Sequence, residues 1–384
     1  MSLSWCRKLP KSLFFRHARY ASTTSNEGGI LVAKDEAEKY VERCMTSVGT
    51  KPEHAKSLAE VLITGDYRSH FSHGLNRLEM YVNDIQSGIT VCNLEPVVLK
   101  QTAATAYVDG QNLLGPVVGN FCMDIAIKKA REAGIGWVVA KGSNHYGICG
   151  WYSIRCADQG FLGMSFTNTS PLSVPTRAKQ AVLGTNPLTL AAPAKKGDPF
   201  VLDMATSAVA LGKIELADRK EMDMPLGWGC DSKGRNTTVP KEALDGGGLL
   251  PLGGVENTSG YKGYGLAMMV EIFCGILAGA EYGPNIRKWK SNDQVANLGQ
   301  SFVAIDPDAF APGFKDRMAD FMEICRGLEP ADGETEVLVA GDPERKHMAL
   351  CDREGGIRYH PNQIKHAIEL AARLGVAPLP TKDG

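Results

Sequence analysis

The chain has 384 residues and a formal net charge of −1, with 43% hydrophobic and 22% charged residues. This composition is typical of a globular protein and excludes disordered and fibrous classes. Because a charge near zero creates no strong electrostatic field, we expect neither nucleic acid nor a membrane as a partner.

The first 26 residues differ in composition from the rest of the chain. Residues 1–26 are basic and rich in serine, and the first acidic residue is Glu27. This composition is typical of a mitochondrial transit peptide, whereas a secretory signal would need a longer apolar run. We therefore predict a matrix protein, with a cytoplasmic protein that carries a disordered basic arm as the alternative.

Residues 27–95 have the pattern of a helical region. Hydrophobic residues at helical spacing predict three helices between residues 30 and 90. The second begins at Lys51-Pro52-Glu53, because proline is favoured in the first turn, and the third ends at Ser87-Gly88. In the C-terminal segment 310–384, helical patterns predict helices over 314–326 and 361–374.

Residues 96–309 alternate between short apolar runs and helical patterns, which is typical of an α/β domain. The longest apolar stretch, 266–280, is shorter than the roughly 20 residues that span a bilayer, so we expect a buried core helix over 260–280. The other predicted elements are a helix over 119–132 and strands over 106–108, 136–140, 162–167, 188–191, 201–203 and 301–305.

The usual phosphate-binding motifs are missing from the sequence. Neither G-x-G-x-x-G nor the P-loop pattern occurs, which argues against a Rossmann domain. The best candidate for a phosphate cradle is segment 259–265 (SGYKGYG), which carries Lys262 and leads into a predicted helix. Backbone N–H groups at a helix start bind anions, but glycines that serve close packing are the alternative.

Several polar segments carry candidate chemistry. Segment 66–77 (DYRSHFSHGLNR) contains Arg77, which suits a carboxylate, and His70 and His73, which do not complete a metal-binding pattern; we predict no metal. Segment 141–147 (KGSNHYG) places His145 directly after a predicted strand, where α/β proteins commonly bind ligands. Three more polar segments also adjoin predicted strands: 167–171 (TNTSP), 183–187 (LGTNP) and 201–207 (VLDMATS).

Taken in order, these segments resemble the malate/L-lactate dehydrogenase family that is unrelated to the Rossmann enzymes. The matching stretches, between about residues 30 and 350, are DYRSHFSHGLNRLEMYV, GSNHYG, TNTSP, VLGTNP, VLDMATS and SGYKGYGLAMMVEI. Relatives in that family include sulfolactate and ureidoglycolate dehydrogenases. The resemblance implies a three-layer α/β/α fold with a mixed sheet, a non-Rossmann site for NAD or NADP, and a homodimer. It also implies an adjoining helical domain, in which the C-terminal segment 310–384 joins residues 27–95.

The resemblance also implies roles for individual residues. His145 matches the catalytic acid/base, with His73 as its rival, and Ser72, His73 and Arg77 match the substrate-side motif. Phe71 departs from the family pattern, since many bacterial relatives carry Asp there, and this bears on the substrate. The residues that match cofactor-side segments are Thr169, Ser170, Asp203, Met204, Ala205 and Lys262, and Asp203 also matches a proposed proton-transfer residue of imine-reducing relatives.

The function implied is a dehydrogenase of small 2-hydroxy acids, with malate and oxaloacetate or a related pair as substrates. The choice between NAD and NADP stays open, because the Rossmann rule for the ribose does not apply to this sequence. The alternatives are a reductase of cyclic imino acids, a metal-dependent hydrolase built on His70 and His73, and a binding subunit without catalysis.

Overall fold

The computed structural model describes residues 28–288, 291 and 294–382. The predicted transit segment, residues 1–26, lies outside the described residues. In the part of the chain that is described, no helix combines the length and the hydrophobicity needed to cross a membrane.

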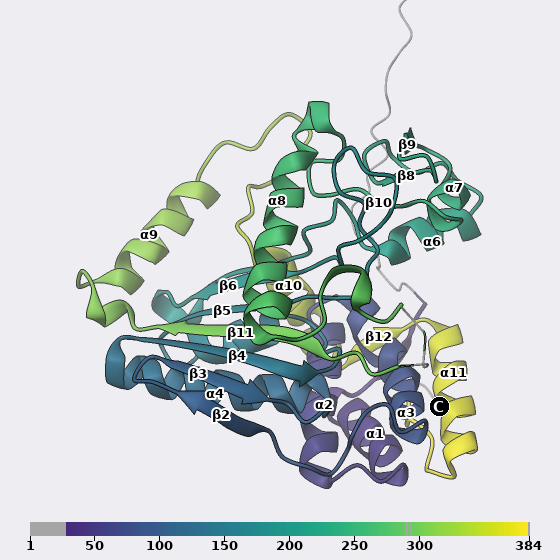
Figure 1. The fold of residues 1–384 in the computed structure, drawn as a ribbon, viewed down its shortest axis with the longest axis horizontal. Coiled ribbons are helices and arrows are strands. Elements are labelled where there is room, and N and C mark those ends of the chain that lie inside the picture. The colour runs from purple at the N-terminus through teal and green to yellow at the C-terminus, as the bar shows by residue number, and fades with distance from the viewer. Residues whose placement is uncertain (1–27, 289–290, 292–293, 383–384) are drawn as a thin grey trace, which may run out of the picture.

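A seven-stranded mixed sheet forms the centre of the molecule, in the order β2-β3-β4-β11-β5-β6-β7 (Figure 1). The β3–β4 pair is parallel, and the other neighbouring pairs are antiparallel. The sheet is therefore mixed, as expected, and differs from a Rossmann sheet, which is mostly parallel. The strands are β2 (Val97–Gln101), β3 (Thr105–Asp109), β4 (Ile135–Ser143), β5 (Leu162–Thr167), β6 (Leu188–Ala192), β7 (Phe200–Met204) and β11 (Leu298–Ile305).

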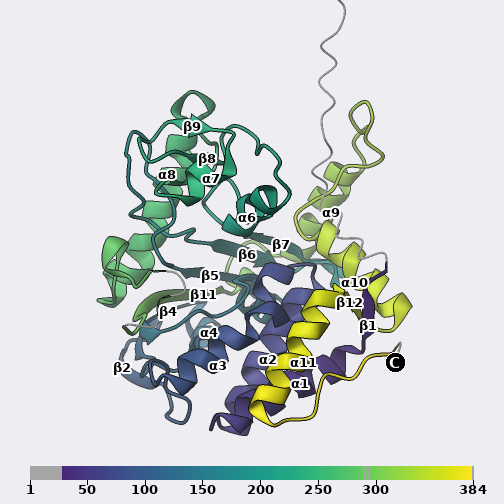
Figure 2. The same cartoon turned by 90° about the vertical axis from the view of Figure 1, so that its right-hand side faces the viewer.

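Helices cover both faces of this sheet and complete the three expected layers (Figures 1 and 2). On one face, α4 (Gly115–Ala133) and α5 (Gly150–Ala157) pack against the central strands. On the other face, α8 (Gly260–Glu271) continues into a π-helical turn, Ile272–Ile276, which packs against β11 and β4.

The N-terminal and C-terminal segments lie together beyond α4 (Figure 2). Two contacts join them: β1 (Ile30–Val32) pairs with β12 (Ile357–Tyr359), and the Tyr40 hydroxyl donates a 2.6 Å hydrogen bond to the carbonyl of Ala367. Both contacts connect the two ends of the chain and close one hydrophobic core. The helices outside the sheet layers are α1 (Lys34–Ser47), α2 (Pro52–Tyr67), α3 (Leu78–Gln86), α9 (Phe314–Arg326), α10 (Asp342–Glu354) and α11 (Pro361–Leu374).

A small lobe between β7 and α8 was not predicted. It lies across the sheet from α1 and α2 (Figure 2) and has its own hydrophobic cluster, which includes Ile214 and Leu249. Strands of two residues are too short to leave a periodic pattern in a sequence. Its elements are α6 (Leu211–Arg219), β8 (Gly229–Cys230), β9 (Asn236–Thr237), α7 (Pro240–Leu244) and β10 (Gly248–Leu249).

The helix predicted over 260–280 is present as far as residue 278, but the prediction that it is buried is wrong. Its α-helical part ends at Glu271, where the π-helical turn begins, and only the face that contacts the sheet is buried. The opposite face exposes Met268, Ile272 and Ile276, whose side chains are 43%, 48% and 54% exposed. Apolar residues on both faces gave the segment its high hydrophobicity, although only one face has a partner in a single chain.

Candidate active site

Four polar segments meet at one edge of the sheet. Because β11 and β6 run opposite to their neighbours, β4, β5 and β7 run in the same direction. Their carboxyl ends, at Ser143, Thr167 and Met204, therefore lie along the same edge. The sequence left open whether these segments converge, and the sheet topology brings their strand ends together.

His145 follows the end of β4 and is held by a residue of α3. The Tyr81 hydroxyl lies 2.5 Å from His145 Nδ1. A hydroxyl can donate to a neutral imidazole nitrogen or accept from its N–H, so this contact can persist in both protonation states. Tyr81 was missed in the sequence, although its position four residues after Arg77 would place both on one face of a helix.

The surroundings of His145 disfavour its charged form. Burial holds the pKa of His145 well below its usual 6.5, and the positive charges of His73, Arg77 and Arg287 add to the effect. Burial also raises the pKa of Tyr81, so its hydroxyl keeps its proton. At neutral pH the pair is therefore an uncharged imidazole beside an uncharged phenol.

The substrate-side motif lies directly against His145. The rings of His73 and His145 are stacked, with centroids 5.7 Å apart and planes 19° from parallel. His73 Nδ1 lies 2.8 Å from the Ser72 hydroxyl, and Arg77 Nε donates to the Ser72 carbonyl at 2.6 Å. Burial lowers the pKa of His73 to about 4. The structure thus brings together His145, His73, Ser72 and Arg77.

A buried carboxylate shapes the loop that presents this motif. Asp66 accepts hydrogen bonds from the Leu75 N–H at 2.8 Å and from the Tyr359 hydroxyl at 2.9 Å. A Cβ at Gly74 would lie 1.7 Å from Asp66 Oδ1, so only glycine fits beside the carboxylate. Burial raises the pKa of Asp66 to about 7. Since Tyr359 belongs to β12, the C-terminal segment supports the motif.

Phe71, the departure from the family pattern, lies in an aromatic environment. Its ring makes edge contacts with His347 at 5.7 Å and with Tyr359 at 6.2 Å between centroids. Phe71 therefore packs toward the C-terminal segment, where an apolar ring has aromatic partners.

The proposed cofactor-side segments contact one another through backbone and hydroxyl groups. The Thr185 N–H donates to Thr169 Oγ1 at 2.9 Å, and the Thr206 N–H donates to the Thr185 carbonyl at 2.8 Å. Ser170 is buried, whereas Met204 and Ala205 are half-buried at the end of β7. The three segments therefore form one polar surface, at the strand ends where ligands commonly bind.

Asp203 connects this surface to the segment that carries His145. Its carboxylate accepts a 2.7 Å hydrogen bond from the Gly150 N–H, at the start of α5. Burial raises the pKa of Asp203, while His70 and Arg68 act in the opposite direction. In the described part of the chain, no hydrogen bond joins Asp203 to His145 or His73, and no group of three potential ligands is placed to hold a metal ion.

Lys262 is exposed in the first turn of α8. Two of its neighbouring glycines serve close packing: a Cβ at Gly260 would lie 1.8 Å from the Gly254 carbonyl oxygen, and one at Gly263 would lie 2.3 Å from the Leu252 carbonyl oxygen. Close packing at these glycines is compatible with a phosphate-binding site, because it fixes the start of the helix that carries Lys262.

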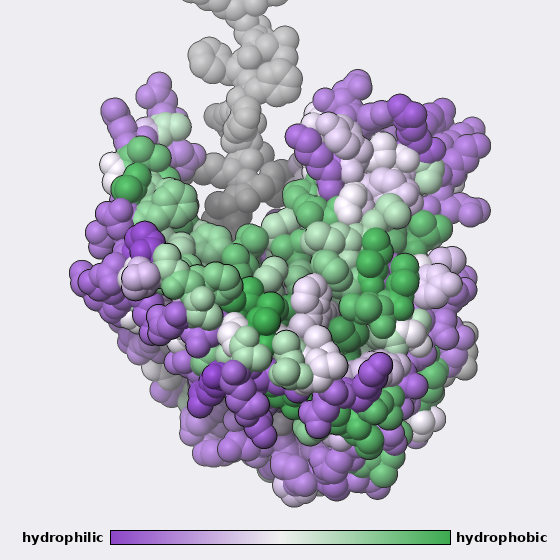
Figure 3. All heavy atoms as spheres, turned by 60° about the vertical axis from the view of Figure 1, so that its left-hand side comes forward, coloured by the Kyte–Doolittle hydropathy of each residue, from purple (hydrophilic) through white to green (hydrophobic). Residues whose placement is uncertain are grey.

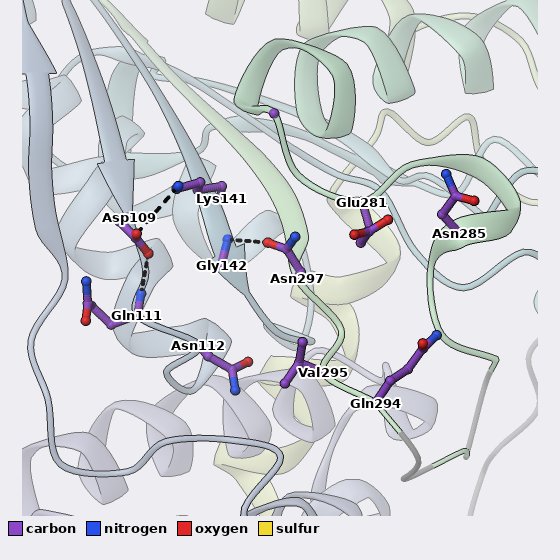
Figure 4. A pocket seen from close by; sticks show the side chains of 11 residues that line it. Asp109, Gln111, Asn112, Lys141, Gly142, Glu281, Asn285, Gln294, Val295 and Asn297 are labelled. Carbon is purple, nitrogen blue, oxygen red and sulfur yellow. Dashed lines mark hydrogen bonds and ion pairs between the residues drawn. The ribbon is translucent and has the colours of Figure 1, made fainter.

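A cavity of about 660 Å³ opens beside the His145 segment, with Lys141 and Asp109 paired at 3.7 Å on its wall (Figure 4). Asn297 Oδ1 accepts a 3.0 Å hydrogen bond from the Gly142 N–H at its floor. His145, His73 and Arg77 do not line it. The lining residues are Asp109, Gln111, Asn112, Lys141, Gly142, Gly279, Glu281, Asn285, Gln294, Val295 and Asn297.

Comparisons with known proteins agree with this architecture. A family model described as malate/L-lactate dehydrogenase matches residues 32–367. A malate dehydrogenase of Pyrococcus abyssi is 39% identical over 360 residues, which cover 92% of this chain and 98% of the relative. L-sulfolactate and ureidoglycolate dehydrogenases also match.

A solved structure and one further relative add to this picture. The structure of a malate dehydrogenase from Pyrococcus horikoshii superposes with a TM-score of 0.85 at 36% identity, over 92% of this chain and 98% of that chain. A Delta(1)-pyrroline-2-carboxylate/Delta(1)-piperideine-2-carboxylate reductase of Pseudomonas syringae is 35% identical over 284 residues, which cover 73% of this chain and 80% of the relative.

Proposed function

The chain belongs to the malate/L-lactate dehydrogenase family, and we propose that it interconverts a small 2-hydroxy acid and its 2-oxo acid with NAD or NADP. Malate and oxaloacetate are the leading substrates, since malate dehydrogenases are among the relatives. The observation that carries the proposal is the contact of His145, just past the carboxyl end of β4, with Tyr81 and His73. Arg77 belongs to the same cluster through its hydrogen bond to the Ser72 carbonyl.

The cofactor-side residues suit a nicotinamide dinucleotide. Such a molecule carries an anionic pyrophosphate and hydroxyl-rich riboses, and it accepts or delivers hydride when bound. The cation of Lys262 suits the pyrophosphate, while the Asp203 carboxylate and the Ser170 hydroxyl suit sugar hydroxyls. We assign Thr169, Met204 and Ala205 to the same cofactor-binding surface, because they adjoin these groups at the strand ends.

His145 is assigned the proton transfer. Because Tyr81 contacts Nδ1, proton exchange with the substrate falls to Nε2. A neutral imidazole takes the proton of the hydroxyl group during oxidation, and the imidazolium returns it to the carbonyl oxygen during reduction. Arg77 suits the substrate carboxylate, because a guanidinium binds a carboxylate with two parallel hydrogen bonds. Ser72 and His73 line the same side of the substrate.

The deciding experiment follows the oxidation of NADH and NADPH by absorbance, with oxaloacetate, pyruvate and 3-sulfopyruvate as oxo acids. We expect turnover of at least one oxo acid with at least one of the two cofactors. A second candidate, reduction of cyclic imino acids, is favoured by the Pseudomonas relative, so the panel includes a cyclic ketimine. Turnover of the ketimine alone would transfer the assignment to that reaction.

Three further features complete the proposal. We assign a helical part to residues 27–95 and 310–384 and a nicotinamide-binding domain to residues 96–309, supported by the β1–β12 pairing and the Tyr40–Ala367 hydrogen bond. We also propose a matrix location, supported by the basic, acid-free composition of residues 1–26. N-terminal sequencing of the native protein tests it, and an intact Met1 in a cytosolic fraction would contradict it.

The third feature is a homodimer, which the family resemblance implies. The exposed apolar face of α8 and the π-turn supports it, since monomeric proteins rarely expose large apolar areas. Figure 3 shows hydrophobic side chains extending across this side of the molecule.

A further inference from the structure

Glu271, the last residue of α8, is a buried carboxylate without an ion-pair partner in the described part of the chain. It is 5% exposed. Its Oε1 accepts hydrogen bonds from Asn168 Nδ2 at 2.9 Å and from the Gly283 N–H at 3.1 Å, and its Oε2 accepts one from Asn186 Nδ2 at 2.7 Å. A buried carboxylate is costly unless such donors compensate it.

The two asparagines cannot turn their amide groups around without losing other bonds. Asn168 Oδ1 accepts from the Gly299 N–H at 3.0 Å, and Asn186 Oδ1 accepts from the Thr169 N–H at 3.1 Å. Because backbone N–H groups occupy both carbonyl oxygens, both NH₂ groups must act as donors. Each NH₂ group donates to a backbone carbonyl, that of Glu281 or Ala267, and also to Glu271. The side chain at position 271 therefore has to accept on both of its terminal atoms, which a carboxylate does and a glutamine amide does not.

The hydrogen bonds of Glu271 and the two asparagines extend to the loops that we assign to cofactor binding. Asn186 reaches the Thr169 N–H, and Thr169 Oγ1 in turn holds the Thr185 N–H. Glu271 lies on the same helix as Lys262. The carboxylate therefore fixes the distance between the loop that carries Thr169 and the helix that carries Lys262.

The π-helical turn that follows Glu271 permits this contact. A Cβ at Gly275, inside the turn, would lie 2.6 Å from Asn168 Nδ2. Glycine and the local widening of the helix together let the asparagine amide approach the helix closely. Turns of this kind are frequent at functional sites.

We propose that Glu271 is the positioning residue for cofactor binding, and that its two carboxylate oxygens hold the Asn168 and Asn186 loops in register with Lys262. This inference rests on the proposed nicotinamide chemistry. It assigns no contact between Glu271 and the cofactor, and it requires a carboxylate at position 271 rather than a polar side chain of the same size.

The test is a pair of single variants and their combination. Glu271→Gln places an NH₂ group against an asparagine NH₂ group, and Asn186→Asp places two carboxylates together. Each single variant should weaken the Kd for NADH or NADPH, measured by fluorescence titration, by about tenfold, while kcat at saturating cofactor stays near the wild-type value. In the double variant the new amide at position 271 can donate to the new carboxylate at position 186, so cofactor should bind more tightly than in Asn186→Asp alone, although the hydrogen bond from residue 186 to the Ala267 carbonyl stays lost.

Controls separate positioning from general destabilisation. Glu323→Gln, at an exposed position of α9, should bind cofactor as the wild type does. Circular dichroism and Tm establish that each variant is folded. Should Glu271→Gln fail to fold, Gly275→Ala replaces it, because its methyl group would displace both the Asn168 amide and the Glu281 carbonyl that this amide bonds, and it leaves the carboxylate unchanged.

The outcomes distinguish this inference from the proposed function. A wild-type protein that binds neither NADH nor NADPH overturns the proposed function, and the role of Glu271 with it. A wild-type protein that binds cofactor while folded single variants bind it equally well overturns only the role of Glu271. A double variant that binds cofactor no better than Asn186→Asp, or a fall in kcat with unchanged Kd, contradicts it as well.

Discussion

At the scale of single residues, the chemistry of His145 depends on what surrounds it. Tyr81 fixes one ring nitrogen, His73 stacks on one face, and burial favours the neutral ring. His73 is itself held by Ser72, and its pKa is lowered to about 4 by burial. The two neutral histidines in contact therefore have different partners: His73 is held by the hydroxyl of its neighbour Ser72, and His145 by the hydroxyl of Tyr81 on α3.

Replacing His145 tests the assignment of the proton transfer directly. His145→Ala should lower kcat by about a hundredfold to ten-thousandfold, the usual contribution of a positioned acid/base, while the Kd for cofactor stays near the wild-type value. Steady-state kinetics with saturating cofactor measure the effect. His73→Ala is the matched control and should mainly raise the KM for the acid. Loss of chemistry in His73→Ala alone would transfer the role to His73.

The lowered pKa of His145 predicts the pH dependence of the two reaction directions. Oxidation needs the neutral ring, and because the pKa lies well below 6.5, kcat/KM for the hydroxy acid should be constant above pH 6.5 and fall as the pH drops through the pKa. Reduction needs the protonated ring, so its kcat/KM should fall as the pH rises through the same value. Rate profiles in both directions measure this. An oxidative midpoint at or above 6.5 would contradict the assignment.

At the scale of elements, the helix α8 joins the proposed phosphate-binding position to the loops at the strand ends. Its first turn carries Lys262, and its last residue, Glu271, holds Asn168 and Asn186. The close packing of Gly260 and Gly263 against the segment 252–254 fixes the start of the helix. The helix therefore separates the two groups of residues that we propose to bind the cofactor by a fixed distance.

Removing the cation at the start of α8 tests its role. Lys262→Ala should raise the KM for cofactor on the order of tenfold, the equivalent of about 1.4 kcal/mol, with little change in the KM for the acid. Initial rates at varied cofactor and fixed acid give both constants. Lys220→Ala, at another exposed lysine, should leave them unchanged. Equal effects of Lys262→Ala on both constants would instead indicate a packing role for this turn.

The elements that the sequence predicted are those with strong periodicity. The strands β3 to β7 and the helices α9 and α11 have their expected positions, because buried runs and amphipathic stripes leave clear patterns. The edge strand β2 was not predicted, since all five of its residues are exposed. The helix α10 was missed because it is largely polar, with only Asp342 and Cys351 buried.

The sequence located the segments of the candidate site, but it did not predict the contacts between them. The motifs located His145, His73 and the cofactor-side segments, because each adjoins a strand or forms a dense polar cluster. The contact of Tyr81 with His145 and the bond of Asp203 to Gly150 join residues 64 and 53 positions apart. Such pairings depend on tertiary packing, which a local pattern does not encode.

At the scale of the whole molecule, one apolar surface is left exposed by the described residues of a single chain. The face of α8 and the π-turn that points away from the sheet exposes Met268, Ile272 and Ile276 at intervals of four residues, which forms one stripe along the helix. The opposite face of the same segment packs on β11 and β4. The stripe lies on the same helical segment as Lys262 and Glu271.

We expect this stripe to lie in the homodimer interface. The wild-type protein should have twice the 41.4 kDa of one chain in solution, because burial of a continuous apolar stripe stabilises association. The double variant Ile272→Glu/Ile276→Glu should have the mass of one chain, since two buried carboxylates per subunit would lack partners at the interface. Light scattering coupled to size-exclusion chromatography measures both masses, and Leu216→Glu, at an exposed apolar residue of α6, is the control that should remain dimeric. A monomeric wild-type protein would contradict the dimer, and a dimeric double variant would place its interface elsewhere on the molecule.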